Sequence, residues 1–139
     1  MITETGIIYL DNGVLYPAMS EDSFLASQVG STSEVLIENN NYKTYKANGS
    51  IGNNVNCEML LVFRKGKLEM VIMSPNWISN YANWHNWNLD NELKKKEKND
   101  KLLQQYLGEP PYIYKWGNIE SIYDPKSGSS EIIIKYDNP

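Results

Sequence analysis

The side chains that most often carry chemistry in proteins are scarce in this sequence. His85 is the only histidine and Cys57 the only cysteine among 139 residues, so a site with two imidazoles or a zinc site with several thiolates cannot form from this composition. Together the two could act as a base and a nucleophile. However, Cys57 begins a strand that we expect to be buried, where an inert thiol is more common. We therefore expect a non-catalytic protein with no bound metal and no cofactor.

Two acidic pairs and one loop also have simpler explanations than catalysis. Glu21 with Asp22, and Asp90 with Glu92, supply the two carboxylates that glycoside hydrolysis requires. Each pair falls at an expected helix start, where the helix dipole favours acids. The run KSGSS at 126–130 is similar to an anion-binding nest, but it lies in a hairpin loop without the strand and helix of a P-loop. We interpret all three as structural.

Aromatic residues gather between positions 77 and 87. Trp77, Tyr81 and Trp84 recur at the spacing of one helical face, Trp87 falls near that face, and His85 lies among them. Buried against a sheet, these residues would be core. Exposed, they would form a contact surface for a protein or a sugar, because Trp and Tyr dominate such surfaces. The sequence leaves both alternatives open.

Charge is unevenly distributed along the chain. Residues 1–42 contain six acids and no Lys or Arg, although the net charge is only −4. This predicts an acidic contact surface for a basic protein partner; acids that only cap a helix and keep the protein in solution are the alternative. The candidate contact residues are Glu21, Asp22, Glu34 and Glu38. Arg64 is the only arginine, which disfavours nucleic acid as a ligand.

The length and the first residues place further bounds on the protein. A chain of 139 residues is long enough for one domain, 1–139, with its own core. The first ten residues, MITETGIIYL, lack the basic segment of a secretory signal and the long apolar run of a membrane span. We therefore expect a cytoplasmic protein that does not bind membranes.

The elements that position these residues are clearest near the carboxyl end. A helix is predicted from Leu89 to about Leu107, with Asn88 as its cap and an apolar stripe of Leu89, Leu93, Leu103 and Leu107; Gly108 with two prolines ends it. Two strands follow, 119–123 and 131–136, joined by a turn-rich loop.

The middle of the chain predicts a central hairpin. Residues 58–64 and 67–73 form its strands around Lys65-Gly66, with Leu61 opposite Met70 and Met59 opposite Ile72. Further hairpins are expected over 6–16 and 34–47, a short helix from Ser20, a mobile loop over 48–56, and a helix opening at Ser74-Pro75. These patterns predict an α+β fold: a mostly antiparallel sheet of about five to seven strands with one long helix packed on one face.

The carboxy-terminal third carries one resemblance. The run WGNIESIYDPKSGSSEIIIKY at 116–136, with the preceding LLQQYLGEPPY, resembles small bacterial proteins, some of which are similar to immunity proteins of polymorphic or contact-dependent toxin systems. The resemblance implies a non-catalytic module that neutralises a toxin by direct binding; with the acidic residues of 1–42, the expected partner is a basic toxin domain. The alternative is a small hydrolase or ligand-binding domain that uses the Trp-rich segment around His85.

Overall fold

The computed structural model describes residues 1–52, 54–77 and 89–137. Within these residues seven strands form one antiparallel sheet in the order β3-β4-β5-β6-β9-β8-β7. This confirms the predicted α+β class with a long helix on an antiparallel sheet. The strands are β3 (Glu34–Glu38), β4 (Tyr42–Ile51), β5 (Val55–Arg64), β6 (Lys67–Pro75), β7 (Tyr112–Tyr114), β8 (Gly117–Asp124) and β9 (Ser129–Tyr136).

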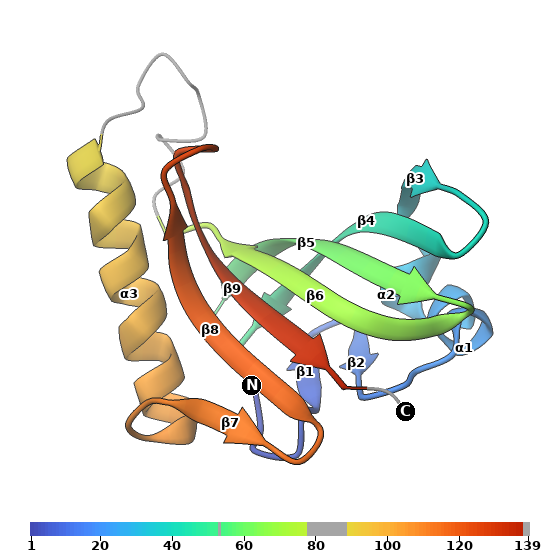
Figure 1. Ribbon diagram of the computed structural model, residues 1–139, viewed down its shortest axis with the longest axis horizontal. Coiled ribbons are helices and arrows are strands. Elements are labelled where there is room, and N and C mark those ends of the chain that lie inside the picture. Colours follow the sequence, from blue (N-terminus) through green and yellow to red (C-terminus); the bar gives the residue numbers. More distant parts are fainter. Residues whose placement is uncertain (53, 78–88, 138–139) are drawn as a thin grey trace.

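The remaining elements flank this sheet at its two ends (Figure 1). The long helix α3 (Leu89–Leu107) lies beside β8 and β9, while α1 (Glu21–Ala26), α2 (Gln28–Ser31) and β3 lie at the opposite end. The first hairpin, β1 (Ile8–Leu10) with β2 (Gly13–Leu15), forms a separate two-stranded sheet. No helix in the described ranges has the length and apolar composition needed to span a membrane.

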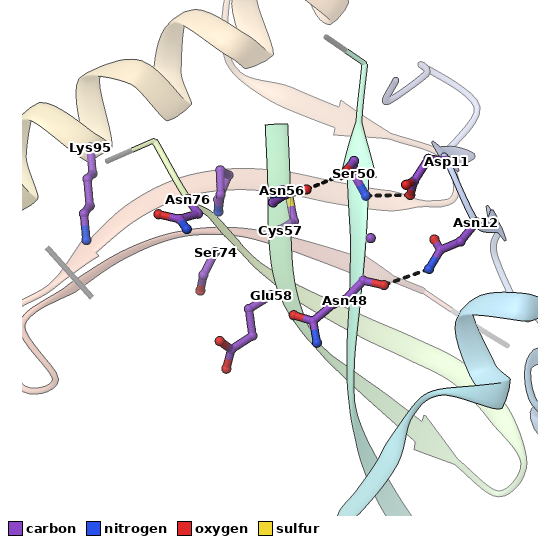
Figure 2. Close-up of a pocket in the computed structure, with 12 residues that line it drawn as sticks. Asp11, Asn12, Asn48, Ser50, Asn56, Cys57, Glu58, Ser74, Asn76 and Lys95 are labelled. Carbon is purple, nitrogen blue, oxygen red and sulfur yellow. Dashed lines mark hydrogen bonds between the residues drawn. The ribbon is translucent and has the colours of Figure 1, made fainter. Parts of the chain in front are cut away.

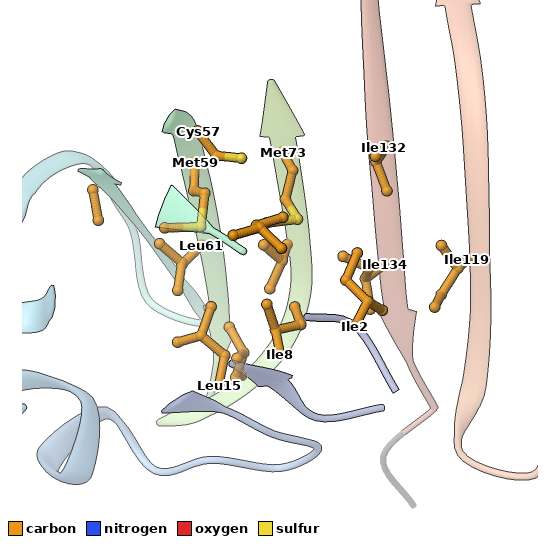
Figure 3. Close-up of a cluster of buried hydrophobic side chains, with 14 of the residues drawn as sticks. Ile2, Ile8, Leu15, Cys57, Met59, Leu61, Met73, Ile119, Ile132 and Ile134 are labelled. Atoms are coloured by element: carbon orange, nitrogen blue, oxygen red, sulfur yellow. The ribbon is translucent and has the colours of Figure 1, made fainter. Parts of the chain in front are cut away.

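One face of the large sheet carries the core. The buried residues of β5 alternate along the strand, and Leu61 and Met59 belong to the same core cluster as Ile8 and Leu15 from the first hairpin (Figure 3). On β9, Ser130 and Tyr136 belong to the same alternating set. Ser130 bonds to α3, whereas the Tyr136 hydroxyl donates to the Gly6 carbonyl oxygen at 2.7 Å. The long helix and the amino-terminal segment therefore share one face of the sheet.

The central hairpin is present, but its predicted register is wrong beyond the first pair. Lys65 and Gly66 both have positive φ (50° and 80°), as a tight two-residue turn requires, and Phe63 pairs with Leu68. A β-bulge then shifts the pairing by one residue, so Leu61 faces Val71 rather than Met70. The reason is burial, because Leu68 and Val71 are both in the core. Side chains alternate between the two faces of a strand, so two residues three positions apart can point to the same face only if a bulge inserts an extra residue between them.

Two other local predictions are also wrong. The expected mobile loop over 48–56 is mostly strand, because β4 and β5 continue as a ladder in which Asn48 pairs with Glu58 and Ser50 with Asn56. Cross-strand pairing overrides the low strand propensity of Asn and Gly there. The Ser74-Pro75 pair does not open a helix, since both residues belong to β6.

The apolar stripe predicted for the long helix is only half correct. Leu102 and Leu103 are buried, but Leu89 and Leu93 are exposed, and the buried residues before Leu102 are Asn91, Glu92 and Asn99. Glu92 bonds to Ser130 of β9, and Asn99 accepts a hydrogen bond from Trp77. Polar partners on the sheet side thus select a polar stripe, which hydrophobic periodicity alone does not reveal.

Candidate functional site

The exposed edge strand β3 is the most distinctive surface of the described chain. Its only strand neighbour among the described residues is β4, and all five of its side chains are exposed. Val35, Leu36 and Ile37 are 47%, 49% and 59% exposed. Contiguous apolar side chains of this kind on an edge strand normally mark a contact site or are protected against association. We call residues 34–38 the β3 patch.

Local sequence explains how the patch is built. The Asn39 side chain accepts hydrogen bonds from the backbone N–H groups of Asn41 and Tyr42, at 3.0 and 2.9 Å, and so closes the turn into β4. A bulge between Val35 and Ile37 then disturbs the ladder, so that Leu36 has no partner residue on β4. The apolar side chains of the patch consequently cannot all face the core.

Two glutamates bound the patch at its ends. In the ladder Glu34 lies opposite Lys46 and Glu38 opposite Lys43. Lys46 Nζ lies 3.3 Å from Glu58, whereas Lys43 Nζ lies 4.0 Å from both Glu21 and Glu38. The patch therefore has an apolar centre and carboxylates at both ends, neither of which has a lysine to itself.

The predicted acidic contact residues divide between this patch and α1. Glu34 and Glu38 belong to the patch, while Glu21 and Asp22 occupy the first turn of α1, after an N-cap in which the Ser20 side chain accepts from Ser23 N–H. Lysines from β4 lie among these acids in space, although none precedes position 43 in the sequence. The surface formed by α1 and the β3 patch is thus less negative than the run of acids in residues 1–42 indicates.

The Trp-rich segment is described only at Trp77. Its indole Nε1 donates to Asn99 Oδ1 at 2.7 Å, and Lys98 Nζ lies 5.8 Å from the ring centroid. Trp77 therefore joins the end of β6 to α3 and packs against the core. The other candidate residues of the segment, which are Tyr81, Trp84, His85 and Trp87, lie outside the described residues, and their role stays a prediction.

A polar pocket of about 550 Å³ lies beside the ends of β4, β5 and β6 (Figure 2). Asp11 accepts a hydrogen bond from Ser50 N–H at 2.8 Å, and Asn12 donates to the Asn48 carbonyl oxygen at 2.9 Å. These contacts hold the β1–β2 turn against β4. Asp11 and the amide nitrogen of Asn12 are engaged in these contacts, and we assign no reaction to this pocket.

Cys57 lines the same pocket but is not a reactive thiol. It is 1% exposed, and burial raises the pKa of its thiol to about 12, so the thiol stays protonated at pH 8. No group of three or more metal-binding side chains occurs among residues 1–52, 54–77 and 89–137.

We expect Cys57 in the folded protein to react with iodoacetamide at pH 8 at least about a hundredfold more slowly than in about 6 M guanidinium chloride, because folding both buries and neutralises the thiol. Mass spectrometry of timed samples measures the two rates. Rapid labelling of the folded protein would contradict the inert assignment and return Cys57 to the candidate nucleophiles.

Comparisons with protein families, with curated proteins and with solved structures find no match to this chain. The site therefore rests on its own geometry. Sequence reasoning identified the two glutamates of the patch but missed Val35, Leu36 and Ile37. The run was visible as a strand, and only the sheet order shows that it lies at an edge rather than in the core.

Proposed function

We propose that this protein is a non-catalytic binding module whose partner is another protein, and that it contacts this partner through the β3 patch. The observation that carries the proposal is the exposure of three consecutive apolar side chains, Val35, Leu36 and Ile37, on an edge strand. Protein contact surfaces typically combine an apolar centre with a polar rim. Glu34 and Glu38 supply such a rim.

The class of partner follows from the rim and from the carboxy-terminal sequence. Carboxylates at both ends of the patch favour a basic surface, which they would attract over distances of about a Debye length. The run at 116–136, with the preceding LLQQYLGEPPY, resembles small bacterial proteins, some of which are similar to immunity proteins, and this supports a role in toxin neutralisation. In this proposal the module neutralises a basic toxin domain by binding it directly.

Site-specific photo-crosslinking tests the proposed contact. A benzophenone side chain in place of Leu36 is expected to form adducts with a protein partner in the producing cells, because this position lies at the centre of the patch. The same group in place of Lys126, an exposed residue of the β8–β9 turn, is the matched control and is expected to give none.

The partner identified by mass spectrometry is then purified for titration. Ile37→Ser is expected to weaken its binding at least about tenfold, or about 1.4 kcal/mol, while the free energy of unfolding changes by less than about 0.5 kcal/mol, as for other surface substitutions. Equal adducts at both positions, or an affinity unchanged by Ile37→Ser, would contradict the proposal.

A further inference from the structure

We infer that the partner contributes an extended segment with a basic residue at each end of a short apolar stretch, and that this segment lies along the free edge of β3. The inference rests on the proposed function, because it specifies the chemistry of the partner at the same patch. It requires three conditions: an accessible edge, complementary charge at both ends, and a reason why a second copy of this chain does not occupy the site.

The edge is accessible within the described chain. β3 is the first strand of the sheet, with β4 on one side and no described strand on the other. Main-chain N–H and C=O groups on an unpaired edge can accept an added strand, and side chains next to them determine which segment fits. Val35, Leu36 and Ile37 offer this segment apolar contacts on exposed side chains.

The inner neighbour of β3 shows which charges suit its two ends. Opposite Glu34 and Glu38, β4 carries Lys46 and Lys43, three positions apart because of the bulge. A segment on the outer edge would meet the same two carboxylates. Lys46 is ion-paired with Glu58, and Lys43 lies equally close to Glu21 and Glu38. A further Lys or Arg at each end, three positions apart so that the two point to opposite faces as Glu34 and Glu38 do, would therefore find an incompletely neutralised carboxylate.

A second copy of this chain is unsuited to the edge. An antiparallel β3–β3 pair centred on Leu36 would place Glu34 of one copy opposite Glu38 of the other at both ends, and parallel pairing in register would also oppose like charges. Like charges directly opposite one another destabilise a strand pair. The charged ends and the bulge are also features that protect natural edge strands from self-pairing. The charge pattern therefore selects a basic segment.

Two synthetic peptides of opposite charge test the inference. The first has the core Lys-Val-Val-Lys, the second Glu-Val-Val-Glu, so that the two charged residues, three positions apart, point to opposite faces of the added strand as Glu34 and Glu38 do. Both have blocked ends and a fluorescein label. At low salt, where exposed charges are screened least, fluorescence anisotropy with the full chain is expected to show at least about tenfold tighter binding of the basic peptide.

Variants of the patch locate the effect. The double variant Glu34→Gln, Glu38→Gln is expected to lose this tenfold preference, and Glu34→Lys, Glu38→Lys to reverse it. Glu97 is exposed on α3, which lies at the end of the sheet opposite β3 (Figure 1), so Glu97→Gln should leave the preference unchanged. Thermal melts of each variant confirm that the fold is retained.

Each result separates the inference from the proposed function. If neither peptide binds, if both bind equally, or if the preference survives loss of both glutamates, the inference is overturned, even where the benzophenone at position 36 captures a protein partner. A dimer in light scattering that is lost on Ile37→Ser would overturn it in favour of a second copy. If the basic peptide binds as expected but no adduct forms at position 36, the preference of the β3 edge for a basic segment is supported and the proposed protein-binding function is contradicted.

Discussion

Leu61→Ala is expected to lower the free energy of unfolding by about 2–5 kcal/mol, the range for large-to-small changes in a core. Leu61 has no exposed surface. It lies on β5, where it pairs with Tyr45 of β4 on one side and Val71 of β6 on the other. Because the neighbouring strands restrain it on both sides, the space left by the side chain can collapse only in part.

Leu60→Ala is the matched control for this prediction. Leu60 is the preceding residue of the same strand, so it points to the opposite face, and it is only half-buried. Leu60→Ala is expected to lower the free energy of unfolding clearly less than Leu61→Ala. Urea unfolding monitored by fluorescence measures both values. A cost below about 0.5 kcal/mol for Leu61→Ala would mean that the assigned burial of this face is incorrect.

The sequence was sufficient for the class of fold because its strongest signals are local. Lys65-Gly66 between two apolar runs indicates a hairpin, and Gly108 with two prolines indicates the end of a helix. These local signals recover most elements of the sheet and the long helix. They do not determine which strands lie side by side, because sheet order depends on contacts between residues far apart in the chain.

The errors arise where a distant partner decides the local structure. The bulge in β6 exists because Leu68 and Val71 both reach the core, and the polar stripe of α3 exists because Ser130 and Trp77 provide partners for it. The candidate site has the same origin. The run Val35-Leu36-Ile37 is equally compatible with a buried strand until the sheet order places it at an edge.

The polar stripe of α3 makes Glu92 the most informative residue for the attachment of this helix. Its side chain is 6% exposed. Oε1 accepts from Ser130 N–H at 3.1 Å, Oε2 lies 3.0 Å from Lys95 Nζ, and the Glu92 carbonyl oxygen accepts from Ser130 Oγ at 2.6 Å. One residue thus joins the first half of α3 to the start of β9, in a stretch of the helix where the exposed leucines contribute little burial.

Glu92→Ala is therefore expected to lower the free energy of unfolding by about 2–4 kcal/mol, because it leaves the buried Ser130 N–H without an acceptor and Lys95 without its carboxylate. Glu92→Gln keeps an acceptor for Ser130 and should recover part of this loss.

Glu97→Ala is the matched control, since the ion pair of Glu97 with Lys101 is exposed and such pairs contribute at most about 1 kcal/mol. Urea unfolding of the three variants distinguishes the contributions. If Glu92→Ala costs no more than Glu97→Ala, the side-chain contacts of Glu92 do not hold α3 on the sheet, and the attachment of the helix depends on its other contacts, which include the buried Leu102 and Leu103.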